Sequence, residues 1–190
     1  MKIRKPSEPG IHSPECEIWE VPSSEGVENL LAGAYEDESI ARYLVDARPV
    51  YDAFSRILAQ LSGVLLLTIT SRRKQLALDH DMFRTAKEQL SEAVARLGAV
   101  HAPPSAQRHR GALEGIATHL SLAATTLDGV FAKAGESSRD AALRDAVKRL
   151  HFAQRMIVAA AEPDANMMPV DLSHACCTCG GSSRATVTTA

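Results

Sequence analysis

Apolar residues recur every three or four positions between Pro49 and Ile69, and this spacing constrains the fold more than any other feature of the chain. On an α-helix such residues form one stripe, which is stable in water when it packs against other apolar surface. The stripe consists of Val50, Phe54, Ile57, Leu58, Leu61, Leu65 and Ile69. Because proline is favourable in the first turn of a helix, we predict a long helix that begins near Pro49 and buries one face.

Three later segments repeat this helical spacing. The first is expected to take its N-terminal caps from Asp79-His80-Asp81 and to end at Gly98, ahead of Pro103-Pro104. The second is expected to span residues 105–135 and the third residues 138–162, each between a serine cap and a Gly or Pro stop signal. Their apolar positions are Phe83, Ala86, Leu90, Val94 and Leu97; then Leu113, Ile116, Leu120, Ala123, Leu127 and either Val130 or Phe131; then Leu143, Val147, Leu150, Met156 and Ile157.

Composition agrees with helices packed on helices. Aromatic residues make up only 4% of the chain, and the apolar residues are mainly Ala, Leu and Val, which favour helices over a β-sandwich. A weaker helical pattern covers residues 25–44. We therefore predict an all-α fold, an up-and-down four-helix bundle with an additional N-terminal helix and flexible arms at both ends.

The predicted domain organisation follows the same signals. Residues 1–24 contain four prolines and are expected to form an extended arm, in which Trp19 could anchor to the body. Residues 25–162 are expected to form the helical bundle domain. Residues 163–190 lose the helical periodicity and are rich in Cys, Ser, Thr and Gly, so we expect a flexible tail.

Charge and hydropathy bear on location and partners. Lys and Arg number 21 against 23 Asp and Glu, a net charge of -2 that does not predict binding to nucleic acid. No apolar stretch follows the basic start of the chain, so we expect no secretory signal and a cytoplasmic location. The segment Leu61 to Ile69 is about half the length that spans a bilayer and is expected to be a buried helix rather than a membrane span.

A cluster of thiols in the tail is the candidate functional site. Cys176, Cys177 and Cys179 follow His174 closely, and in a reducing cytoplasm they would remain thiols rather than disulfides. Thiolates and an imidazole are ligands for soft metal ions, so we predict a site that binds or delivers Cu(I) or Zn, or thiol chemistry with a partner protein. The compact spacing favours copper or a site shared between chains. Cys16 is expected to be an isolated, partly buried thiol.

Two other functions fit the same tail. Cys, Ser and Thr are the side chains that tailoring enzymes cross-link in ribosomally made peptides, so the chain could be the precursor of such a peptide with a helical leader. Alternatively the bundle is a protein-interaction module in which the cysteines are incidental. In either case we predict another protein docking on the bundle and no catalytic residues; apolar helix faces also allow a homo-oligomer.

Histidines and basic residues in the body have ordinary structural explanations. His119 lies near the apolar face of its helix and is expected to be partly buried with a satisfied hydrogen bond. Arg108-His109-Arg110 is expected to be a solvated turn, and His80 and His101 are placed in a capping segment and a loop. The Glu-x-x-His pairs of di-iron bundles are absent from the sequence.

Overall fold

The computed structural model describes residues 30–31, 35–70, 76–131 and 136–169, and describes no side chain in 76–80 or 136–138. These residues belong to one compact unit, Ser23–Pro169. The arm expected at 1–24 and residues 170–190 of the expected tail lie outside the described residues.

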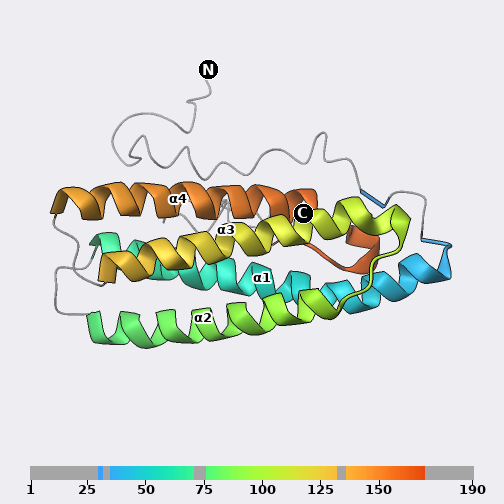
Figure 1. The fold of residues 1–190 in the computed structure, drawn as a ribbon, viewed down its shortest axis with the longest axis horizontal. Coiled ribbons are helices and arrows are strands. Elements are labelled where there is room, and N and C mark those ends of the chain that lie inside the picture. The colour runs from blue at the N-terminus through green and yellow to red at the C-terminus, as the bar shows by residue number, and fades with distance from the viewer. Residues whose placement is uncertain (1–29, 32–34, 71–75, 132–135, 170–190) are drawn as a thin grey trace, which may run out of the picture. The chain divides into compact units, whose positions relative to one another are not determined.

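Four long helices account for most of the described residues (Figure 1). They are α1 (Glu38–Thr70), α2 (Leu76–Ala99), α3 (Gln107–Phe131) and α4 (Glu136–Ala159), with short 3-10 turns η2 (Pro104–Ala106) and η3 (Pro163–Ala165). Within the described ranges no strand is present, apart from a single β-bridge between Glu162 and Met167. The prediction of an all-helical protein is therefore confirmed for this part of the chain.

The core lies between the four helices, which run side by side in Figure 1. The most extensive contacts join α3 to α4 and α1 to α2, and α1 also touches both α3 and α4. The predicted stripe of α3 is buried throughout, at Leu113, Ile116, Leu120, Ala123, Leu127 and Val130. At Gly115 of α3 the end of the Met156 side chain from α4 occupies the space that a Cβ would take, so any larger residue there would require Met156 to move.

The helix boundary expected at Pro49 is wrong, because α1 continues through this proline from Glu38 to Thr70. Residues 38–44 are therefore the first turns of α1 and no separate N-terminal helix ends at residue 44. Proline removes one N–H and leaves the carbonyl of Val45 without its usual partner. Val45 is 71% exposed, so water can satisfy that carbonyl. On the opposite face Tyr43, Ala47 and Phe54 are buried, which holds both halves of the helix against the core.

The start expected for the next helix is also wrong, because α2 begins at Leu76 and Asp79-His80-Asp81 lie inside it. Two predicted core positions are exposed as well: Ile69 is 55% and Val94 is 40% accessible. The buried stripe of α2 instead passes through Ala93, one residue away from Val94. A shift of one residue turns a helix by about 100°, so the sequence pattern gave the right helix with one edge of the stripe misplaced.

The first seven residues assigned to the tail fold back onto the body. Residue Asn166 adopts the left-handed conformation, with φ of 58°, and ends the turn η3. The main chains of Glu162 and Met167 then pair through two hydrogen bonds of 3.0 Å. Met167 is fully buried in the core, so the described chain is fixed at this end by an apolar anchor.

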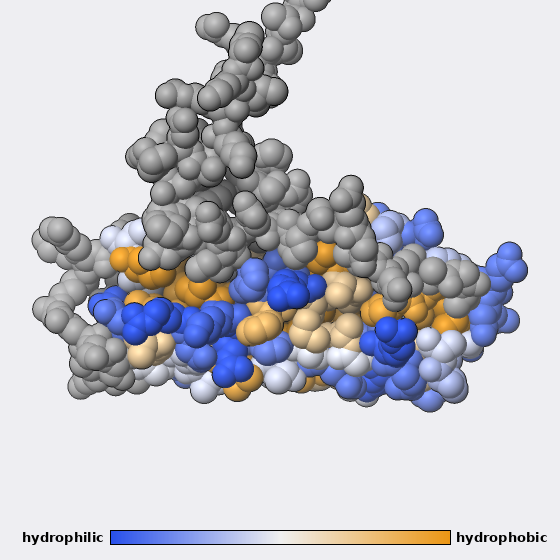
Figure 2. All heavy atoms as spheres, turned by 90° about the horizontal axis from the view of Figure 1, so that it is seen from above, coloured by the Kyte–Doolittle hydropathy of each residue, from blue (hydrophilic) through white to orange (hydrophobic). Residues whose placement is uncertain are grey.

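The apolar character of α1 also meets a membrane criterion. Among the described residues it is the helix whose length and composition would allow it to cross a bilayer. In the fold, 44% of its most apolar window is buried, and core helices of soluble proteins have the same composition. Large apolar side chains also reach the surface elsewhere, and Figure 2 shows a face where hydrophobic residues lie among hydrophilic ones.

Candidate functional site

The predicted metal ligands His174, Cys176, Cys177 and Cys179, like Cys16, lie outside the described residues, so the thiol cluster stays a prediction. Within the described ranges no group of three or more His, Cys, Asp or Glu residues could hold a metal ion. The polar chemistry that the structure does describe lies in two places. One is a buried set of hydrogen bonds around the end of α4, and the other is a pair of clefts along α1.

His109 is the centre of the buried set, and its prediction as part of a solvated turn is wrong. The imidazole is fully buried. Its Nδ1 lies 2.7 Å from the hydroxyl of Tyr43 on α1, and its Nε2 lies 3.1 Å from the carbonyl oxygen of Ala160. The rings of Tyr43 and His109 meet edge to face, with centroids 5.6 Å apart. The residue thus joins α1, α3 and the chain that follows α4.

These partners fix the proton positions. A carbonyl oxygen only accepts, so Nε2 of His109 must donate to Ala160. In the neutral ring Nδ1 is then an acceptor, and the hydroxyl of Tyr43 donates to it. Burial lowers the pKa of His109, although the bond to Ala160 acts in the opposite direction. Burial also raises the pKa of Tyr43, and this effect outweighs the positive charge of Arg110, which lowers it. Both groups are therefore held neutral.

A second tyrosine completes the end of α4. The last carbonyl groups of a helix have no partner within it and must find one elsewhere. The hydroxyl of Tyr51 on α1 donates to the carbonyl of Ile157 at 3.2 Å, as His109 does to that of Ala160. Burial raises the pKa of Tyr51 too. Side chains of α1 and α3 thus cap the C-terminal end of α4, and this set is structural because solvent does not reach it.

Glu162 follows directly and is fully buried. Its carboxylate accepts a hydrogen bond of 3.1 Å from the backbone N–H of Leu31, and a second one from the hydroxyl of Tyr35. A buried carboxylate is tolerated where donors surround it. The residue therefore ties the chain after α4 to the chain that precedes α1.

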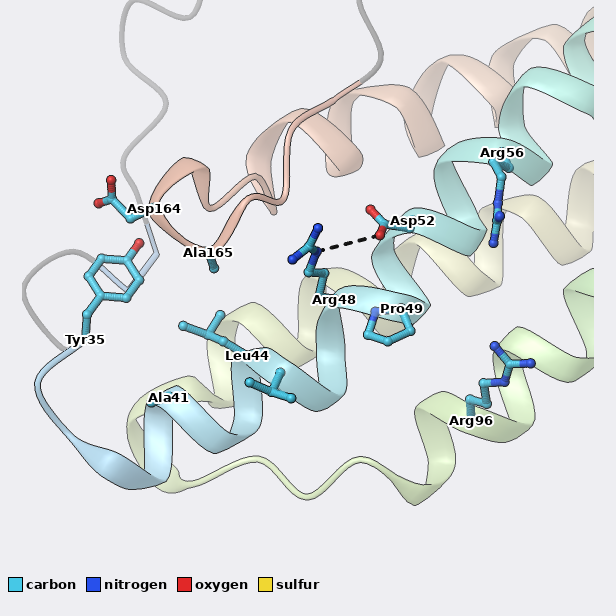
Figure 3. Close-up of a pocket in the computed structure, with 11 residues that line it drawn as sticks. Tyr35, Ala41, Leu44, Arg48, Pro49, Asp52, Arg56, Arg96, Asp164 and Ala165 are labelled. Carbon is cyan, nitrogen blue, oxygen red and sulfur yellow. Dashed lines mark ion pairs between the residues drawn. The ribbon is translucent and has the colours of Figure 1, made fainter.

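A cleft of about 690 Å³ opens beside this turn (Figure 3). Its apolar wall includes Leu44, Val45 and Pro49 of α1. Its polar lining includes Arg48 and Asp52, which form a half-exposed ion pair of 3.9 Å. The remaining lining residues are Tyr35, Ala41, Arg56, Arg96, Asp164 and Ala165.

A smaller cleft of about 260 Å³ lies further along α1 and α2. Arg56 of α1 and Arg96 of α2 line both clefts, so they stand at the boundary between the two. In Figure 3 their side chains extend toward the space between the helices. Gln60 also lines the smaller cleft, and its Oε1 is buried without a hydrogen-bond partner.

The other histidine predictions have mixed outcomes. His119 is half-buried as expected and stacks on Phe152 with centroids 5.4 Å apart, but its buried Nδ1 has no hydrogen-bond partner. His101 lies in a loop, as expected, and its side chain is exposed. The side chain of His80 lies outside the described part of the structure.

Two sequence signals could have located the buried set. His109 precedes Leu113 by four residues and Ile116 by seven, so it lies on the apolar stripe of α3. Tyr43 precedes Ala47 and Val50 in the same way on α1. The grouping of Arg56 with Arg96 had no such signal, because it depends on how α1 and α2 pack.

Relatives give no further guide to these residues. Comparison of the chain with models of known protein families, with curated proteins and with solved structures finds no match.

Proposed function

We propose that this chain is a helical carrier of a C-terminal thiol cluster that binds or delivers a soft metal ion. The observation that supports this role is the anchored turn after α4, where Met167 is fully buried. Cys176 follows nine residues later, and nine extended residues span at most about 30 Å. This chain length limits the reach of the proposed cluster to about 30 Å from Met167.

The donor set fits Cu(I) or Zn. His174 would supply an imidazole nitrogen, and Cys176, Cys177 and Cys179 would supply thiolate sulfurs. When bound, the ion would hold these thiols deprotonated. A cytoplasmic location, where thiols stay reduced, is part of the proposal, and so is another protein that docks on the helical body to receive the ion.

The proposed body is an up-and-down four-helix bundle. Two short connections support this arrangement. Residues 71–75 join α1 to α2, and residues 132–135 join α3 to α4. Connections of this length favour antiparallel neighbours. The two helix pairs that these connections join are also the pairs with the most extensive contacts.

Metal-dependent protection of the thiols tests the proposed role. The full chain is reduced, incubated with Cu(I) or Zn(II), alkylated, and analysed by peptide mass spectrometry. We expect the ion to slow alkylation of Cys176, Cys177 and Cys179, since a coordinated thiolate is a poor nucleophile. Cys16 serves as the internal control, because its alkylation should not change. Equal rates at all four cysteines with and without metal would contradict the proposal.

A variant with all three clustered cysteines replaced by Ser gives the matched measurement. It should lose tight metal binding and keep the melting temperature of the helical body, because the described core contains none of these residues.

The intact mass of the protein from its native host separates the other functions. A covalent mass change in the tail would indicate a modified peptide precursor, whereas an unmodified, metal-free chain that still captures a partner would indicate an interaction module.

A further inference from the structure

The two clefts along α1 and α2 meet at a pair of arginines whose positive charge is only loosely compensated. Arg96 has one acidic neighbour, Glu92, at 3.9 Å, which is the outer limit of an ion pair. Arg56 forms no ion pair with any described residue. Both guanidinium groups line the same two clefts, so an anion bound there would be attracted by two positive charges.

The clefts around this pair of arginines have room and apolar surface for a ligand larger than an inorganic ion. The larger cleft has the size of small-molecule sites, which measure roughly 300–1,000 Å³. Its apolar wall carries Val45, a large aliphatic side chain left 71% exposed, beside Leu44 and Pro49. On the other side of the arginines, the unpaired Oε1 of Gln60 could accept a hydrogen bond from a hydroxyl.

We propose that these clefts bind an amphiphilic organic anion. Its phosphate or carboxylate head lies between Arg56 and Arg96, and its apolar body lies in the larger cleft along Val45 and Pro49. Guanidinium groups suit both heads, since each can donate two parallel hydrogen bonds to two oxygens. The acidic side chain of Asp164 lies at the far end of the larger cleft, away from Arg56 and Arg96 in Figure 3, which disfavours the reverse orientation. This site is independent of the thiol cluster.

Octyl phosphate below its micelle concentration is the probe, with octanoate, inorganic phosphate and octanol as separate arms. Isothermal titration with the full chain should give saturable binding of both octyl anions. Inorganic phosphate lacks the apolar body and octanol lacks the charge, so each should bind at least about 10-fold more weakly. Binding of octanol as tight as that of octyl phosphate would overturn the proposal, and so would binding to phosphatidic acid vesicles without binding to the monomeric anions.

The double variant Arg56→Gln and Arg96→Gln should weaken octyl phosphate binding by at least about 10-fold, because charge-assisted hydrogen bonds are lost. Arg155→Gln is the matched control: it removes an exposed arginine from α4, outside both clefts, and should leave binding within twofold. Circular dichroism checks that the variants stay folded. If the double variant unfolds, Arg56→Gln alone replaces it, since this side chain is exposed and unpaired. Binding unchanged in a folded arginine variant would overturn the site.

Discussion

Replacing Tyr43 by Phe tests whether the buried hydrogen bonds hold the helices together. Phe fills the same space, so the change removes one hydroxyl and leaves Nδ1 of His109 as a buried acceptor without its donor. An unsatisfied buried polar group costs about 1–3 kcal/mol of folding free energy. For a domain of this size each kcal/mol lowers the melting temperature by roughly 2–4 °C, so we expect a fall of about 2–12 °C.

Urea unfolding followed by circular dichroism at pH 7.5 measures this loss directly, because burial keeps His109 neutral there. Thr118→Val is the matched control. It removes a hydroxyl whose hydrogen bond, of 2.9 Å, is similar in length but lies at an exposed site on α3. Its effect should stay within about 0.5 kcal/mol.

A double-mutant cycle with His109→Leu isolates the interaction. Once the imidazole is gone, Tyr43→Phe no longer leaves a buried acceptor without its donor. The stability loss of the double variant should therefore be smaller than the sum of the two single-variant losses by about 1 kcal/mol. Additive losses, or a loss below about 0.5 kcal/mol for Tyr43→Phe alone, would refute this account of the buried set.

Two further predictions rest on other features of the core. The folded pKa of His109 is lowered by burial from the usual 6.5, so below about pH 6.5 the unfolded chain binds a proton that the folded chain does not. The free energy of unfolding should therefore decrease as the pH is lowered in this range, by up to about 1.4 kcal/mol per pH unit. Urea unfolding at several pH values should show a weaker pH dependence of stability for His109→Gln. Gly111→Ala, at an open position on α3, should stabilise by about 0.5–1 kcal/mol through helix propensity. Gly115→Ala would place its Cβ against the flexible end of Met156 on α4, which must then move, so this variant should gain less stability than Gly111→Ala. Equal melting temperatures of the two variants would contradict that expectation.

The sequence by itself determined the helices and most of their buried faces. Residues such as Leu113, Ile116 and Leu120 repeat at a helical spacing, and that spacing depends on the local chain alone. The continuation of α1 through Pro49 could not be obtained in this way, because local propensity there is overridden by packing on both sides of the proline. The same holds for Asp79-His80-Asp81, which resembles a cap and lies within α2.

Tertiary structure decided which polar residues act together. Tyr43 and His109 are 66 positions apart, and Leu31 and Glu162 are 131 apart, so their hydrogen bonds depend on how the helices are placed. The same is true of Arg56 and Arg96, which line the same clefts because α1 lies against α2. The thiols of the tail are the opposite case. Their proximity is set by the chain itself, since Cys176, Cys177 and Cys179 are neighbours in sequence whatever fold surrounds them.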